Sequence, residues 1–345
     1  MIIATSTSRP QMRLLRLARS GLALLAGAAL PVAFAAETGT TGAAPPATPV
    51  PVRIGAYLTS LYDLNGANNT FVADFWLWFV HARNRELTPL KTVEPDNARD
   101  FKTSLETVEE HGGERYHAQK VRGLFNHSWD VANFPFDRHE LTIRLSEAQT
   151  ETDGLVYLAD TANTAFDPNI VVEGWRLEKV SIATQPREFN SAFGLPGKEA
   201  RSRYAGAVIT IAVRRDALGI FIKLHAAVYI IFLVSLISFL MDSSKDAFFT
   251  SRVGMLSGMI FTVVLNSQRI ASTVGGGNAV SLPDKIHILT LFALLGALIT
   301  VLITRRMHAA GQSARALRID RQAGLWTLVL YSLANAALIA AARFA

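Results

Sequence analysis

The stretch Trp129–Leu141, WDVANFPFDRHEL, is a proline-containing turn with an aspartate on either side of the proline. Strand-like sequence surrounds it, since VRGLFNHS precedes it and TIRLSEA follows it. Four long apolar runs come later in the chain. A turn set in strands and followed by apolar runs indicates a β domain joined to a membrane domain.

The composition agrees with this division. Half of the 345 residues are apolar and only 18% are charged, which is typical of a chain that lies partly in lipid. The net charge is +6, but the arginines gather at the N-terminus and between the last two apolar runs, so we expect topology signals and no nucleic-acid partner. The chain has no cysteine, which excludes disulfides and thiol chemistry.

The N-terminus has the features of a secretory signal. Four arginines precede the apolar run GLALLAGAALPVAF, and small residues follow it, so residues 1–35 are predicted to be a signal peptide. The alternative is a membrane-spanning anchor, for which the run is short. Residues 36–51, rich in Pro, Thr, Ala and Gly, are predicted to be a flexible leader.

The chain from 52 to 215 has the two-residue period of strands, with a hairpin signal at Asn65-Gly66. It is predicted to form an all-β extracellular immunoglobulin-like sandwich. Residues 216–345 are predicted to form an all-α four-helix transmembrane domain, with helices at about 217–240, 249–269, 285–304 and 324–342. The segment RRMHAAGQSARALRIDR is rich in arginine and is expected in the cytoplasm, which leaves the C-terminus outside.

The turn D-V-x-x-F-P-F-D, the pair of arginines before the first apolar run and the four crossings together resemble the pentameric ligand-gated ion channels, the Cys-loop receptor superfamily. IGAYLTSLYDL, DFWLWF and VEPDNARDF are similar to the bacterial, cysteine-free members. Two cysteines close this turn in animal members, and His127 and Leu141 stand at those positions here. The resemblance implies a homopentamer in the bacterial inner membrane that conducts inorganic ions and has no cofactor. It also implies that the N-terminal domain, residues 52–215, is a periplasmic ligand-binding domain and that the C-terminus is periplasmic.

By the same resemblance, the turn presses on the loop STVGGGNAVSLPDK between the second and third membrane helices. Asp137 can pair with a basic group such as Arg215; alternatively, Asp137 caps its own backbone. The family tends to place an acid at the tip of the first hairpin, whereas this chain has Asn65 and Gly66 there. The coupling residues are predicted to be Asp130, Phe134, Pro135, Phe136, Asp137 and Arg215.

The second apolar run is predicted to line the pore. At about 100° per residue, one helix face carries small and polar groups at its ends and large apolar groups in its middle. Phe261 and Leu265 are expected to close the pore by excluding water. The alternative is a lipid-facing helix whose glycines allow close packing. The predicted pore-lining residues are Ser251, Gly254, Gly258, Phe261, Leu265 and Gln268.

The residues at the ends of this run predict a pore that is not strongly cation-selective. Cation-selective members carry a glutamate where Ser251 precedes Arg252, and Arg269 adds positive charge at the outer mouth. Two departures weigh against an anion channel: Thr250-Ser251 replaces the Pro-Ala of anion-selective members, and Asp246 lies nearby.

In the first apolar run, Lys223 is expected to reach the membrane surface, or His225 makes gating sensitive to pH.

Aromatic residues are the candidates for an agonist site between subunits, and they are Trp76, Trp78, Phe189, Phe193 and Tyr204. For Trp76 and Trp78, burial in the core of the sandwich is the competing interpretation. The agonist is left open as a small molecule, a proton or a divalent ion. Glu110, His111, Glu114 and His117 match no strict metal motif, so a solvated loop is expected there.

Two other classes of function are alternatives to a channel. His127, Ser128, Asp130 and His139 suggest a hydrolase, but the chain lacks a glycine-flanked nucleophile turn, so we expect no enzyme. A non-conducting membrane-anchored periplasmic receptor or scaffold is the stronger alternative to a channel.

Overall fold

The computed structural model describes residues 48–274 and 279–344, so the predicted signal peptide and residues 36–47 of the predicted leader lie outside the described residues. The first strand begins at Val50, two residues before the predicted boundary of the β domain. The elements of this domain are β1 (Val50–Asn65), β2 (Thr70–Ala82), α1 (Pro89–Thr92), β3 (Val93–Pro95), β4 (Ala98–His111), β5 (Glu114–Asn126), β6 (Arg138–Glu151), β7 (Leu155–Ala159), β8 (Ala165–Phe166), β9 (Trp175–Thr184), β10 (Arg187–Phe189) and β11 (Ser202–Arg215).

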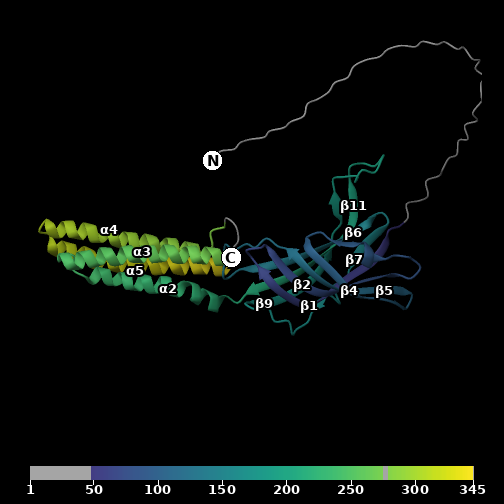
Figure 1. Ribbon diagram of the computed structural model, residues 1–345, viewed down its shortest axis with the longest axis horizontal. Coiled ribbons are helices and arrows are strands. Elements are labelled where there is room, and N and C mark those ends of the chain that lie inside the picture. The colour runs from purple at the N-terminus through teal and green to yellow at the C-terminus, as the bar shows by residue number, and fades with distance from the viewer. Residues whose placement is uncertain (1–47, 275–278, 345) are drawn as a thin grey trace, which may run out of the picture. The chain divides into compact units, whose positions relative to one another are not determined.

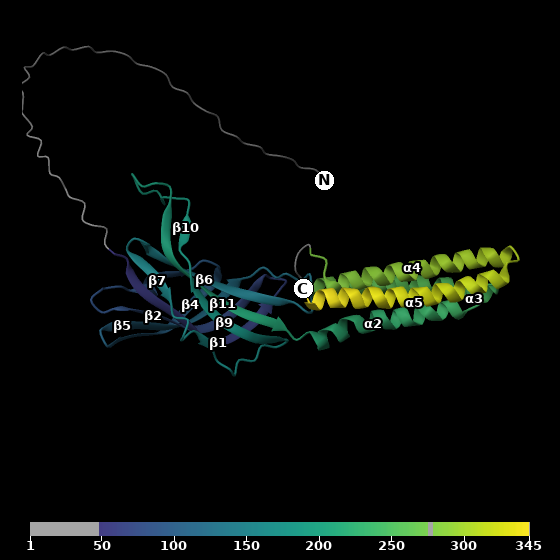
Figure 2. The same ribbon diagram turned by 180° about the vertical axis from the view of Figure 1, so that it is seen from behind.

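The strands form two sheets, which make a sandwich. The first has the order β4-β5-β2-β1-β7, with β8 also paired to β1, and β7 and β8 run parallel to β1. The second has the order β10-β11-β6-β3, with β9 paired to the later part of β11. In Figure 2, β10 and the start of β11 extend away from the rest of the sheets.

The core lies between the sheets and follows the alternation of side chains along each strand. In β1 the buried positions include Val52 and Ile54, and in β6 they include Leu141 and Ile143. The clean two-residue period of these strands is what made the sandwich predictable from the sequence.

Four helices follow the β domain: α2 (Ala217–Ile237), which continues into the short 3-10 helix η1 (Ser238–Leu240), α3 (Asp246–Val274), α4 (Leu282–Ala309) and α5 (Ser313–Phe344). All four are long and apolar enough to cross a membrane, so the chain has the architecture of a multi-pass membrane protein. They run alongside one another (Figure 1), and α4 contacts each of the other three.

The helices extend further into the arginine-rich segment than the sequence predicted. α4 begins at Leu282, where Ser281 and Asp284 form a reciprocal capping box. It ends before Gly311, whose φ of 78° is left-handed, and α5 begins at Ser313 rather than near 324. Hydropathy marks only the stretch that can lie in lipid, and helices built from Ala, Arg and Leu continue beyond it.

Candidate functional site

The turn is joined to the last residue of β11 by a bidentate ion pair. Arg215 Nε donates to Asp137 Oδ1 at 2.8 Å, and Arg215 Nη2 donates to Oδ2 at 2.9 Å. The Arg215 backbone N–H also donates to the Asp137 carbonyl at 3.2 Å. The Asp137 side chain is 2% exposed and that of Arg215 17%. The contact suggested by the sequence is therefore present, and it lies two residues before α2.

The surroundings hold both partners in place. His139 Nε2 lies 2.9 Å from Asp137 Oδ2, on β6. The Arg215 guanidinium lies over the Phe134 ring at 4.6 Å and the Trp175 ring at 4.0 Å. Burial by itself would raise the pKa of Asp137, but the hydrogen bonds from His139 and Arg215 outweigh it and hold that pKa below its ordinary value. The carboxylate therefore stays ionised.

Phe136 connects the turn to the helices through packing contacts. Its half-buried ring lies 5.7 Å from that of Phe221 on α2. It packs against a cluster that also contains Leu282 and Ile286 at the start of α4. The turn therefore reaches two of the four helices; residues 275–278, part of the loop predicted to meet the turn, lie outside the described residues.

The other two turn residues have local roles in the structure. Pro135 is joined to Phe134 by a cis peptide bond. Asp130 is exposed, and its Oδ1 accepts a hydrogen bond of 3.0 Å from the backbone N–H of Ala132. It is thus Asp130, and not Asp137, that caps its own backbone.

Aromatic rings pack around His127, one of the two positions where animal channels have cysteines. Its ring lies 4.9 Å from that of Trp129, 5.5 Å from that of His139 and 6.3 Å from that of Phe71. Burial, and then the charge of His139, lower the pKa of His127 to about 4. The other position, Leu141, is buried in the core.

One face of α3 is uncovered by the other three helices. All six predicted pore-lining residues lie on it and are exposed, with Phe261 at 65% and Leu265 at 49%. Ser257 and Thr262, which were not among the predicted pore-lining residues, also lie on this face. Their positions follow the same helical period as the six, so a wider angular window would have included them.

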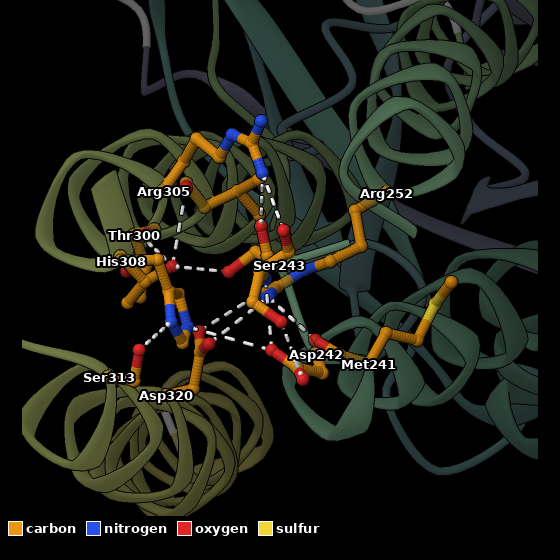
Figure 3. A network of polar contacts seen from close by, with 12 residues as sticks. Met241, Asp242, Ser243, Arg252, Thr300, Arg305, His308, Ser313 and Asp320 are labelled. Carbon is orange, nitrogen blue, oxygen red and sulfur yellow. Dashed lines mark hydrogen bonds and ion pairs between the residues drawn. The ribbon is translucent and has the colours of Figure 1, made fainter. Parts of the chain in front are cut away.

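The opposite face of α3 buries a charge. Arg252 is 0% exposed and forms two hydrogen bonds with Asp320 of α5, of 3.1 and 2.9 Å (Figure 3). It also donates to the carbonyl oxygen of Met241 at 2.9 Å. Arg252 therefore points away from the exposed face and its charge is paired.

A second set of polar contacts surrounds this buried pair at the same end of the helices. Arg305 of α4 donates to the carbonyl oxygens of Ser243 and Ser244 and forms an ion pair with Asp246, the first residue of α3 (Figure 3). His308 Nδ1 lies 3.1 Å from Ser313 Oγ. These contacts tie α3, α4 and α5 together.

Three of the five aromatic ligand candidates form a cluster. The Phe189 ring lies 5.3 Å from Phe193 and 5.9 Å from Tyr204, and Phe193 lies 6.3 Å from Tyr204. Arg187 lies 5.2 Å over the Phe189 ring and 3.7 Å from Asp96, which lines a neighbouring pocket of about 470 Å³. Phe193 is 59% exposed. The cluster offers rings and charged groups on one surface.

The two tryptophans lie elsewhere, on the first sheet. Phe75 and Leu77 point into the core, so Trp76 and Trp78 occupy the opposite face, contrary to the interpretation that placed them in the core. Trp78 is nevertheless buried, because it lies over Gly55 and donates from Nε1 to Asp160 Oδ2 at 3.1 Å.

His225 lies inside the helix bundle, with its ring 4.3 Å from that of Phe221, which contacts Phe136 of the turn. It is fully buried, its Nδ1 is 2.9 Å from the Phe221 carbonyl oxygen, and its ring is 6.5 Å from that of His287. Lys223 is exposed.

The histidines and glutamates of the β4–β5 hairpin are engaged with other partners. His111 lies 2.7 Å from Glu109, and His117 Nε2 lies 3.0 Å from His81 Nε2. Glu110 pairs with arginines 83 and 115, and Glu114 with arginine 53. Within residues 48–274 and 279–344, no three such side chains form a group that fits a metal ion.

No model of a known protein family matches the chain, and no curated protein matches it in sequence. The architecture, a β-rich domain followed by four apolar helices, is compatible with that of the pentameric ligand-gated ion channels.

Proposed function

We propose that the chain is a homopentameric ligand-gated ion channel of the bacterial, cysteine-free branch of the Cys-loop receptor superfamily. Its immunoglobulin-like sandwich lies in the periplasm and receives the stimulus, and α3 of each subunit lines the pore. The chain lies in the bacterial inner membrane with its C-terminus on the periplasmic side. The stimulus is a small molecule, a proton or a divalent ion.

One observation carries the proposal, the chemistry of the exposed face of α3. The exposed residues in the middle of α2, α4 and α5 are almost all apolar, both large and small, as contact with lipid requires. Glycine, serine, threonine and glutamine interrupt the exposed face of α3. Small and polar groups along one face suit a water-filled passage formed by several copies of the helix.

The contacts of the turn support the gating half of the proposal. Asp137 and Arg215 connect the turn to the end of β11, two residues before α2, and Phe136 connects it to α2 and α4. A displacement of the sandwich is therefore passed to the helices through side chains in contact. The cluster of Phe189, Phe193 and Tyr204 is the best supported of the agonist-site candidates.

The test is to record current from purified protein in lipid bilayers and to probe α3 with cysteines. The chain has no cysteine of its own, so each introduced thiol reports one position. Gly258→Cys should react with a water-soluble thiol reagent and alter the current. Val263→Cys, on the buried face of the same helix, should react far less.

Equal reactivity at the two positions contradicts a pore lined by this face. Reaction at Gly258→Cys without any current favours the non-conducting receptor or scaffold instead.

A further inference from the structure

The two charges near the start of α3 are paired with residues of other helices. α3 contains three ionisable side chains, which are Asp246, Arg252 and Arg269. The first two lie in its first two turns, at the end that we expect in the cytoplasm. Asp246 pairs with Arg305 of α4, and Arg252 pairs with Asp320 of α5. Both charges at this end of the proposed pore helix are therefore compensated by helices outside it.

The two pairs differ in their access to water. The side chains of Asp246 and Arg305 are 87% and 33% exposed, whereas those of Arg252 and Asp320 are 0% and 2% exposed. Water and salt screen an exposed charge, but they screen a buried one much less. Since an α-helix with its side chains is about 10–12 Å across, Arg252 lies within about one helix diameter of the exposed face that carries Ser251. The net charge of the Arg252–Asp320 pair therefore affects the electric field at that face.

Asp320 is the group that neutralises Arg252. The guanidinium forms hydrogen bonds of 3.1 and 2.9 Å with Asp320 and one of 2.9 Å with the Met241 carbonyl oxygen (Figure 3). A guanidinium group does not lose its proton in proteins, so only a neighbouring negative charge can cancel its charge. Within residues 48–274 and 279–344, Asp320 is the only carboxylate that forms an ion pair with Arg252. It is also the only acidic residue of α5, between Arg318 and Arg321 in the sequence.

We propose that Asp320 determines the ion selectivity of the pore from outside the pore, by neutralising Arg252. The inference rests on the proposed homopentameric channel and adds a determinant on α5, a helix that does not line the passage. In the pentamer, five Arg252–Asp320 pairs surround the cytoplasmic mouth with no net charge. Without the carboxylates, five buried positive charges would remain there, and their summed field would attract chloride and repel potassium.

A purely stabilising role of Asp320 would have a different consequence. Removal of the carboxylate would then lower the number of channels, because the pair holds α3 against α5, and each remaining channel would pass the same ions. The reversal potential separates the two roles. It depends on the relative permeability of potassium and chloride and not on the number of channels.

The experiment records currents from the purified full chain in planar lipid bilayers under a potassium chloride gradient. The reversal potential gives the permeability ratio of chloride to potassium. In Asp320→Asn this ratio should rise about threefold or more relative to wild type. Asp320→Glu, which keeps the charge but alters the packing, should keep the wild-type ratio. R252M/D320L, which removes both charges, should also keep it.

Gln312→Lys is the matched control. It raises the net charge of each subunit by one, as Asp320→Asn does, at an exposed position between α4 and α5. Its permeability ratio should stay near the wild-type value, since the surrounding solution screens the added charge. Equal rises in Asp320→Asn and Gln312→Lys would overturn the inference, and so would a rise in Asp320→Glu as large as that in Asp320→Asn.

The outcomes also separate this inference from the channel proposal. If wild type conducts and Asp320→Asn has the wild-type ratio, this inference is wrong and the channel proposal stands. If wild type conducts no ions, the channel proposal fails and this inference fails with it. If Asp320→Asn does not assemble by itself, pentamers mixed from variant and wild-type subunits are recorded instead. Their ratio should rise with the share of variant subunits, and a constant ratio contradicts the inference.

Discussion

At the scale of residues, Arg215 is the most heavily constrained charged group at the end of the β domain. Its guanidinium makes two hydrogen bonds to Asp137 and lies over two aromatic rings. An ion pair with fixed geometry that is shielded from water contributes more to stability than an exposed ion pair does. Lysine cannot reproduce the fork or the stacking, so the position requires arginine.

We therefore expect Asp137 and Arg215 to be coupled energetically. Asp137→Asn and Arg215→Gln should each destabilise the protein, and the double variant should lose less than the sum. A coupling free energy of about 1–3 kcal/mol is expected. The measurement is a double-mutant cycle on the free energy of unfolding, followed by tryptophan fluorescence.

The neighbouring pair Arg214–Glu178 provides the control. Its side chains are 41% and 39% exposed, so the same cycle there should give no more than about 1 kcal/mol. Additive effects at Asp137 and Arg215 would mean that the turn acts on the helices through Phe134 and Phe136 alone.

His127 should make the β domain sensitive to acid. Its pKa is about 4 in the folded chain and 6.5 when unfolded, so the folded state keeps it neutral. As the pH falls from 6.5 to 4, the unfolded state takes up a proton that the folded state does not, and the free energy of unfolding decreases. After allowance for solvent screening, the loss is about 1–2 kcal/mol.

The variant His127→Phe, which keeps a ring beside Trp129 and His139, should remove this part of the pH dependence. The measurement compares thermal unfolding of the two proteins at pH 7 and pH 4.5. Identical pH dependence in both would show that His127 does not carry the effect.

At the scale of elements, α3 has two faces with opposite requirements. One is exposed and carries small and polar residues, whereas the other holds Arg252 against Asp320 in the bundle. Removing one partner of a buried pair leaves an uncompensated buried charge. Asp320→Asn should therefore lower the free energy of unfolding by about 3–5 kcal/mol. The measurement is the temperature at which the purified protein loses its native elution volume.

Asp246→Asn is the matched control, because Asp246 also pairs with an arginine but its side chain is 87% exposed. Asp246→Asn should lower the free energy of unfolding by about 1 kcal/mol or less. Replacing both buried partners, as in R252M/D320L, should recover much of the stability lost in Asp320→Asn. If Asp320→Asn lowers this temperature no more than Asp246→Asn does, the charge of Arg252 is not buried and has access to water.

The same helix shows what periodicity predicts and what it misses. The position of Gly258 or Phe261 on a face follows from spacing along one helix, and all six predicted residues lie on the exposed face. The burial of Arg252 depends on Asp320, 68 positions away on another helix. A local pattern contains no information on such a partner, so the burial of Arg252 could not be predicted from the sequence.

At the scale of the whole molecule, hydropathy and the strand period predicted the order of a β domain and four helices. They did not predict which of the ligand-site candidates lie together. Phe189, Phe193 and Tyr204 are close in sequence and come together across the pairing of β10 and β11, whereas Trp78 is on the other sheet. A pocket lined by arginines of β6, β9, β11 and α5 could not be predicted from the sequence either, because these arginines are scattered along the chain.

The proposed pentamer gives the last prediction, because each substitution is repeated five times around the axis. With Arg252 paired to Asp320, uncharged Ser251 is the first of the predicted pore-lining residues, at the end of α3 that we expect on the cytoplasmic side. Ser251→Glu would place five carboxylates in one ring, and their summed field attracts cations and repels anions. In a potassium chloride gradient the reversal potential should move toward the potassium equilibrium potential. Gln312→Glu, an exposed position between α4 and α5, adds the same charge away from α3 and should leave the reversal potential near the wild-type value. Equal shifts in the two variants would mean that Ser251 does not face the ion path, since a charge on the pore wall acts on permeating ions more strongly than one screened by the surrounding solution.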